Sequence, residues 1–388
     1  MFKNCTALVK APDLPAEDIT NANYCYYEMF YGCTGLVDAP YIAAKNTAEY
    51  CFCQMFMECF NLVNVQDELY PTELSYECYH NMFYNCASLI SAPNLPASEI
   101  PEKAYQGMFR GCSNLINVQS IFSTTTVGVR SCEGMFHSCY NLVSAPKLLA
   151  TQLAERCYQD MFYECSSLVN PPTLPATQLA EYCYRHIFYK CTSLTKAPIL
   201  PATQMVEYCY RDMFRYCTNL SEITVNFNSW NDTSTYYWVE SVAGSGVFKC
   251  PTNLAREYGV SRIPSGWTIS SFNVNDSPFG DTGTDNDNND NSSTENTITQ
   301  LTITGTPYGA DGTYTIHDTS VTGFNRIWVL SDGSYCIRYV TTSQQWCLWV
   351  KIGSSVEDEH DWVIVNSISD GENPWDNQLH DTIVCNKN

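Results

Sequence analysis

The sequence has few basic residues and no long apolar run. Of its 388 residues, 20 are lysine or arginine and 41 are aspartate or glutamate, which gives a formal net charge of −21. Nucleic acids and anionic membranes are bound through basic patches, so we expect neither as a partner. No stretch approaches the roughly 20 consecutive apolar residues of a transmembrane helix, so we expect no membrane insertion.

The chain also lacks the features of a secretion signal and of a catalytic motif. Its first residues contain no basic segment and no apolar core of a signal peptide. None of the six histidines lies in a triad, metalloprotease or phosphate-binding context. Those in the repeats, His80, His137 and His186, are expected mostly on the solvent side. We therefore expect no enzyme, no catalytic residue and no cofactor.

What the sequence does contain is a unit of about 26 residues repeated along its first half. Cysteines in the pattern Phe-x-x-Cys recur at spacings of 28, 26, 27, 26, 27, 26, 26 and 26 residues. A period in this range marks a solenoid, in which each unit buries its apolar face against its neighbours. The cysteines are Cys5, Cys33, Cys59, Cys86, Cys112, Cys139, Cys165, Cys191 and Cys217.

Within one unit, the apolar spacing predicts a helix over residues 153–165. Apolar residues fall in two adjacent rows at steps of four, which together make one broad apolar stripe. Gln159, Asp160 and Glu164 are predicted on the solvent face, and Thr151 is predicted as the N-cap. The fold class is therefore α/β, with one helix and one short strand in each unit.

The predicted strand follows the helix at residues 168–171. Proline at position 171 ends it, because proline lacks the N–H that a sheet needs and favours extended geometry before it. A Leu-Pro-Ala turn then leads to the next helix. Stacking of such units would form a parallel sheet on one side of the solenoid and a layer of helices on the other.

The repeated pattern Met-Phe-x-x-Cys-x-x-Leu-Val-x-Ala-Pro, with its Leu-Pro-Ala turn, resembles the BspA-like leucine-rich repeat family of bacterial and gut-phage surface proteins. The resemblance covers residues 1–222 and implies a leucine-rich-repeat solenoid with a role in adhesion or host-surface recognition. Some units depart from the pattern. Ala104 replaces a cysteine, Cys132 sits one place late, and the segments 64–66 and 119–123 are irregular. We expect a partner to dock where the repeat is broken, at residues 60–72 or 117–133.

The rest of the chain is predicted to form three further parts. Residues 223–270, with Trp230, Tyr236, Tyr237 and Trp238, are predicted as an aromatic cap on the open end of the solenoid. Residues 271–296 are rich in Asp, Asn, Ser and Thr and are predicted as a flexible linker rather than a calcium loop. Residues 297–388 are predicted as a small all-β module of the sandwich or barrel type, with short strands between Gly, Asp, Ser and Asn.

The cysteines of the repeats are predicted to be buried free thiols that pack as small apolar residues. On a helix, Cys157 and Cys165 would lie about 12 Å apart, which is beyond the reach of a disulfide. Cys51 and Cys53 give only a weak zinc signal, so we expect no metal site. Cys336 and Cys347 differ, because a turn near residues 341–342 would place them across a hairpin, either as a disulfide or as two free thiols.

Five tryptophans of the β module are candidates for ligand binding. An exposed aromatic ring beside Asp, Asn and Gln can cover the apolar face of a sugar while the polar groups bind its hydroxyls. The alternative is core packing, since a module of about 90 residues needs large side chains to bury enough area. The candidates are Trp328, Trp346, Trp349, Trp362 and Trp375.

These features predict a non-enzymatic adhesion or recognition protein that binds a host or bacterial surface protein or glycan. A rigid surface joined to a tethered module suits this role, because a second contact raises the effective concentration. The predicted location is extracellular, either on a cell surface after loss of an export segment or on a virion as a phage fibre. The alternatives are a glycan-active enzyme with its chemistry in the β module and an intracellular scaffold. The sequence does not indicate an oligomeric state.

Overall fold

The computed structural model describes residues 1–116, 118 and 124–273, together with the backbone of seven strands between residues 300 and 386. The chain divides into two compact units, Met1–Gly283 and Thr284–Asn388. The boundary falls inside the segment predicted as a linker, most of which lies outside the described residues. The division into four parts remains a prediction.

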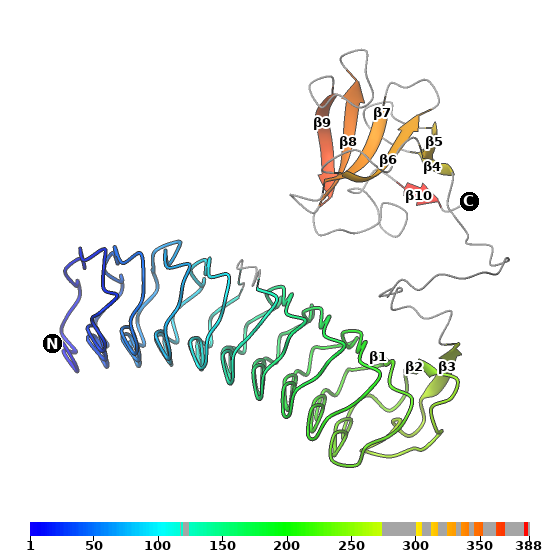
Figure 1. Ribbon diagram of the computed structural model, residues 1–388, viewed down its shortest axis with the longest axis horizontal. Coiled ribbons are helices and arrows are strands. Elements are labelled where there is room, and N and C mark those ends of the chain that lie inside the picture. Colours follow the sequence, from blue (N-terminus) through cyan, green and yellow to red (C-terminus); the bar gives the residue numbers. More distant parts are fainter. Residues whose placement is uncertain are drawn as a thin grey trace. The chain divides into compact units, whose positions relative to one another are not determined.

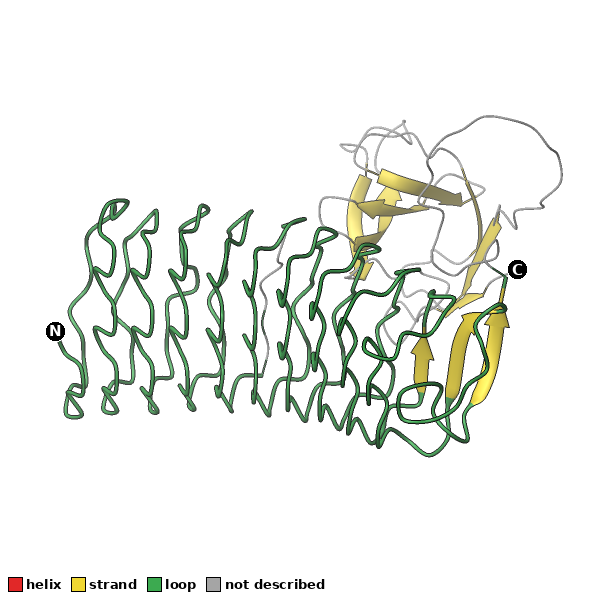
Figure 2. Cartoon of the chain, turned by 60° about the horizontal axis from the view of Figure 1, so that its bottom comes forward, coloured by secondary structure: helices red, strands yellow, loops and turns green. Residues whose placement is uncertain are grey.

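The described part of residues 1–273 forms one row of flattened coils, with one coil for each repeat (Figures 1 and 2). In the extended segment of each coil, neighbouring units meet in parallel, often through a single bridge such as that between Ser144 and Asn170. Toward the end of the row the bridges lengthen into a parallel sheet of order β1-β2-β3. Its strands are β1 (Glu222–Thr224), β2 (Val247–Pro251) and β3 (Thr268–Phe272).

The helix predicted in each unit is wrong. The described residues contain no helix, and therefore none that could cross a membrane. Residues 153–165 form overlapping turns, in which the N–H of Met161 donates to the carbonyl of Tyr158 at 3.3 Å. The alternate N–H groups donate to the next unit instead, as Phe162 does to the carbonyl of Ile187 at 3.0 Å. We call this arrangement, and its equivalent in every unit, the turn ladder.

The turn ladder depends on left-handed backbone geometry at every fourth residue. Arg156, Asp160 and Glu164 have φ angles of 57°, 56° and 60°. Such a conformation costs an ordinary residue about 1–2 kcal/mol, which the hydrogen bonds between units offset. With no helix to cap, Thr151 is not an N-cap. Gln159, predicted on the solvent face, is 7% exposed and therefore buried.

The two apolar rows that suggested a helix do form the core. Their most regular element is a column of phenylalanine rings, one from each unit, stacked 5.5–5.9 Å apart with planes within 6° of parallel. We call it the phenylalanine column. Trp238 lies at its far end, fully buried and 6.1 Å from Phe214, whereas Tyr236 is 44% exposed. The column comprises Phe2, Phe30, Phe56, Phe83, Phe109, Phe136, Phe162, Phe188 and Phe214.

The cysteines of the Phe-x-x-Cys pattern link neighbouring units. The thiol of Cys165 donates to the carbonyl oxygen of Phe136, 29 residues earlier, with a sulfur–oxygen distance of 3.1 Å. The same contact recurs from Cys33 to Cys217 at 2.9–3.2 Å. A cysteine therefore fills a small apolar site and also supplies a weak donor, which alanine would not. All eighteen described cysteines are free thiols, and sixteen of them are buried.

The irregular units adapt without breaking the row. Cys132 is fully buried at the place that Tyr105 and Tyr158 occupy in the units on either side. Ser131, one residue earlier, takes the place of the usual cysteine and is also fully buried. Gln66 stands where other units have proline, and its side-chain oxygen accepts a hydrogen bond from the N–H of Ile42 at 2.8 Å.

The second unit contains a seven-stranded antiparallel sheet in the order β10-β4-β5-β6-β7-β8-β9. The strands are three to seven residues long, in keeping with the short strands predicted for residues 297–388. Whether the sheet closes as a barrel or packs as a sandwich remains a prediction. The strands are β4 (Gln300–Thr304), β5 (Gly312–Ile316), β6 (Phe324–Leu330), β7 (Tyr335–Val340), β8 (Gln345–Lys351), β9 (Trp362–Ile368) and β10 (Val384–Asn386).

Candidate binding surface

The extended segments expose a column of β-branched residues, which we call the valine column. Along each segment side chains alternate between core and solvent, as in any strand. Leu168 is therefore fully buried while Val169 is 47% exposed. The equivalent positions in the last units carry Thr195 and Ser221. The exposed members are Val9 (65%), Val37 (38%), Ile90 (49%), Ile116 (42%), Val143 (37%) and Val169 (47%).

Backbone hydrogen bonds hold the valine column in register. The N–H of Val143 donates to the carbonyl of Ile116 at 3.1 Å, and that of Val169 donates to the carbonyl of Val143 at 3.0 Å. Because these bonds run from unit to unit, the backbone of the column is rigid. An apolar surface that is already ordered loses little entropy when it binds a partner.

A polar row lies beside the valine column, one residue further along each segment. Its members bond across units, with 3.0 Å between the Asn170 amide nitrogen and Ser144 Oγ. Near the end of the row, Lys196 forms an ion pair with Glu222 at 3.2 Å. The surface therefore combines an apolar column with hydrogen-bonding groups at a fixed spacing, as protein interfaces do.

A groove on this surface, with a volume of about 670 Å³, joins two neighbouring units. Its wall is mostly apolar and rich in proline. Proline has no N–H, so this wall presents few backbone donors. The groove is lined by residues that include Val169, Pro171, Pro172, Pro198, Ile199 and Pro201.

Two further grooves lie in or beside the irregular units. One of about 560 Å³ is lined by residues that include Thr72, Ile100 and Val127. The other, of about 380 Å³, is lined by Val65, Ile90 and others. These grooves lie at the segments 60–72 and 117–133, where docking was predicted, although the segment 119–123 lies outside the described residues. Docking at these places remains a prediction.

The turn ladder carries polar clusters between units, and some of them contain histidine. His186 lies between Asp160 and Asp212, which occupy the same position in the preceding and following units. His80 and His186, which were expected mostly on the solvent side, are half-buried, with side chains 23% and 18% exposed. Burial and the charge of Arg110 lower the pKa of His137 to about 4.

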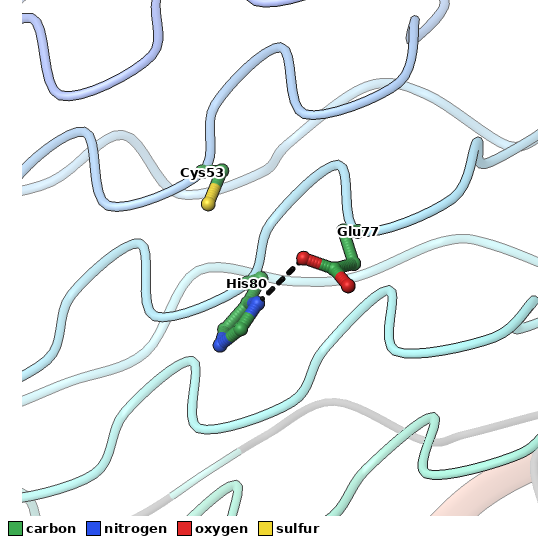
Figure 3. Close-up of side chains that lie close together, drawn as sticks. All are labelled: Cys53, Glu77 and His80. Carbon is green, nitrogen blue, oxygen red and sulfur yellow. Dashed lines mark hydrogen bonds and ion pairs between the residues drawn. The ribbon is translucent and has the colours of Figure 1, made fainter.

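The second cluster contains Cys53, Glu77 and His80, whose ligand atoms all lie within 4.8 Å of one another (Figure 3). Nδ1 of His80 is 2.9 Å from a carboxylate oxygen of Glu77. The other oxygen of Glu77 accepts a hydrogen bond from Lys103 at 2.9 Å. In Figure 3 the sulfur of Cys53 points toward the unit that carries the other two residues.

The pKa values in this cluster follow from burial and hydrogen bonding. Burial raises the pKa of the Cys53 thiol to about 12, with the nearby carboxylate of Glu77 acting in the same direction. Burial also acts to raise the pKa of Glu77, but hydrogen bonds from His80 and Lys103 outweigh it and lower the pKa overall. The resting cluster at neutral pH therefore holds a thiol and a carboxylate.

The tryptophans and cysteines predicted as sites in the second unit are placed only by their backbone. Trp328 lies in β6, Trp346 and Trp349 lie in β8, Trp362 lies in β9, and Trp375 lies outside the described residues. A sugar site there remains a prediction. The pairing of β7 with β8 sets Cys336 opposite Trp349 and Cys347 opposite Arg338. The two cysteines are therefore not Cα partners, and a bond between them remains a prediction.

Comparison with known proteins matches the repeats to one family. The family described as BspA type leucine rich repeat region matches residues 24–169 and 132–238 in six copies. Among solved structures, a leucine-rich repeat protein from Bacteroides ovatus matches at 14% identity over 56% of this chain and 76% of that one, with a TM-score of 0.18. A search of curated proteins gave no match.

Proposed function

Because the chain belongs to the BspA-type leucine-rich repeat family, whose members generally serve in surface adhesion or binding, we propose that it is a non-enzymatic recognition protein. Its solenoid would bind a surface protein through the valine column and the grooves beside it. The observation that carries this proposal is the exposure of six β-branched residues at one repeat position, the first being Val9 and the last Val169.

An exposed apolar column is costly for a soluble protein unless it meets a partner. Contiguous apolar patches with polar surroundings mark interaction sites. Here the polar surroundings are the row that includes Ser144, Asn170 and Lys196. The column runs along several units, so it suits a broad protein surface better than one small ligand.

The proline-lined groove gives this surface a place for an anchor. Its volume of about 670 Å³ has room for one or two large apolar side chains of a partner. Val169 and Ile199 line the groove, which therefore continues directly from the valine column. An aromatic or aliphatic anchor in such a pocket supplies most of the energy of many interfaces.

The second unit would add an independent contact. We propose a small β module of the sandwich or barrel type that binds a glycan through some of its tryptophans. Two contacts on one chain raise the effective concentration of the second once the first is made. Support for the glycan rests on the tryptophan-rich sequence of residues 328–375.

We place the protein outside the cell, on a cell surface or on a virion, in keeping with the surface exposure typical of the family. The proposal is tested by binding of the whole chain to an array of host proteins, bacterial surface proteins and glycans. Binding to a surface protein with at least micromolar affinity is expected. Absence of binding to every member of the array would contradict the proposal. Binding to glycans alone would indicate that the second unit, and not the solenoid, makes the contact.

A further inference from the structure

Cys53 differs from the other cysteines of the repeats. Apart from Cys132, which fills the buried place of Tyr105 and Tyr158, the packing cysteines recur at two positions of the unit, those of Cys51 and Cys59. Cys53 stands at neither position. Its equivalents in the following units are His80, Gln106 and Glu133, all polar residues of the turn ladder. Packing of the repeat therefore does not explain a cysteine at this position.

The neighbours of Cys53 are the residues that bind transition metals. His80 occupies the same position in the next unit, and Glu77 lies one turn before His80. In the described part of the chain, these three form the one group of histidine, cysteine and acidic side chains whose spacing suits an ion. Both Cys53 and Glu77 are almost fully buried, at 3% and 8% exposure.

We propose that Cys53, Glu77 and His80 bind a single Zn²⁺ ion that joins two neighbouring units of the solenoid. Thiolate, imidazole and carboxylate are the usual ligands of zinc, at about 2.0–2.3 Å from the metal. Ligands at such distances lie roughly 3–4 Å from one another in a tetrahedron. Ligand atoms already within 4.8 Å reach this arrangement by small side-chain rotations. The fourth position is left for water.

The charges of the cluster suit a divalent cation. When the ion binds, the Cys53 thiol gives its proton to solvent and the sulfur–metal bond forms. The ion then carries one thiolate and one carboxylate, so the group is neutral and its burial is inexpensive. Lys103 competes with the metal for Glu77, but it already has a second partner in the hydroxyl of Tyr76 at 2.7 Å.

Cobalt is the probe that tests the site, because a cobalt–thiolate bond absorbs in the near ultraviolet. The reduced, metal-free full chain is titrated with Co²⁺ and then with Zn²⁺, with bound metal counted by mass spectrometry. We expect one ion per chain, a charge-transfer band that Zn²⁺ abolishes, and release of about one proton per ion. Affinity should rise about tenfold per pH unit, because the thiol must lose a proton.

Variants separate this site from the other thiols of the chain. Cys53→Ala should abolish the band, whereas the matched control Cys51→Ala removes a core cysteine two residues away and should keep it. His80→Gln introduces the residue found at the equivalent position 106, so it should fold normally and weaken binding by at least about 100-fold. Lys103→Met removes the competitor for Glu77 and should tighten binding.

Two results would overturn the proposal. One is a wild-type chain that takes up no Co²⁺ under reducing conditions. The other is Cys53→Ala or His80→Gln with the same stoichiometry and affinity as wild type. Thermal unfolding with and without Zn²⁺ provides an independent reading. The ion should raise the melting temperature of wild type and Cys51→Ala, and raise that of His80→Gln much less.

Discussion

Nδ1 of His186 lies 2.8 Å from Oδ1 of Asp160, which occupies the same position in the preceding unit. The other ring nitrogen is 3.3 Å from Asp212 in the following unit, so one imidazole links three units. Burial and the charge of Arg185 act to lower the pKa of His186, but the hydrogen bonds to the two carboxylates outweigh them and raise it. The same bonds lower the pKa of both aspartates, against the effect of burial.

This link predicts a stability that depends on pH. The contribution of His186 is complete below about pH 6.5 and is lost as the pH rises through its raised folded-state pKa. The contribution of the aspartates is complete above about pH 4 and is lost as the pH falls. His186→Gln should therefore lower the free energy of unfolding most near pH 5.5, by about 1–3 kcal/mol, and least near pH 8.5. Urea denaturation at both pH values measures this difference.

His137 provides a control of opposite sign. Its pKa is lowered to about 4 by burial and the charge of Arg110, so it stays neutral in the folded state at pH 5.5. As the pH falls, His137 takes up its proton at a higher pH in the unfolded chain than in the folded chain. The folded state of the wild type is therefore destabilised as the pH falls. Relative to wild type, the free energy of unfolding of His137→Gln should therefore be higher at pH 5.5 than at pH 8.5. Identical pH trends for the two variants would contradict the assignment of His186.

The phenylalanine column predicts a large loss of stability on truncation. Phe136 is fully buried and stacks on Phe109 at 5.6 Å and on Phe162 at 5.7 Å. Phe136→Ala should cost about 3–5 kcal/mol, because it leaves a cavity between two units that depend on each other. Phe136→Leu, which keeps most of the volume, should cost clearly less. A cost under about 1 kcal/mol for the alanine variant would argue against a continuous column.

The thiols predict a sharp difference in reactivity. Cys5 and Cys25 are exposed, whereas Cys165 and the other Phe-x-x-Cys cysteines from Cys33 to Cys217 are buried, with pKa values raised by burial. Alkylation of the native reduced chain, followed by peptide mass spectrometry, should modify Cys5 and Cys25 first and Cys165 only on unfolding. Rapid labelling of Cys165 in the native chain, or labelling of Cys165 only after reduction, would show that the cysteines do not serve for packing.

The sequence predicts the row of units, the core positions and the buried cysteines, because the apolar pattern recurs at a fixed period. It mispredicts the helix for a physical reason. A row at steps of four drifts about 40° per step around a helix with 3.6 residues per turn, so a strict four-residue period fits the turn ladder better. Glycines at positions 32, 107, 111 and 134 have φ angles of 61–77°. They lie at left-handed positions that in other units carry Asp, Glu or Tyr. These residue types do not by themselves indicate a left-handed backbone, so the sequence does not predict it.

The clusters between units were missed because their members are far apart in the sequence. Cys53 and His80 are 27 residues apart, and His186 is 26 residues from both Asp160 and Asp212. No local motif joins them. Aligning the units by the Phe-x-x-Cys cysteines places Cys53 and His80 at one position, which was the signal available. The exposure of the valine column depends on which side of each extended segment faces solvent, and packing alone determines that.

The most direct test of the recognition account compares two sets of variants against the surface protein found on the array. Val143→Ser with Val169→Ser removes the last two exposed members of the valine column and introduces serine, which stands at the same repeat position as Ser221. Tyr27→Gln removes an aromatic ring that is 39% exposed on the turn ladder and introduces the residue found at position 106. Equilibrium binding should weaken at least about tenfold for the double variant and change less than about twofold for Tyr27→Gln. Unchanged binding by the double variant, with loss on Tyr27→Gln, would contradict the account.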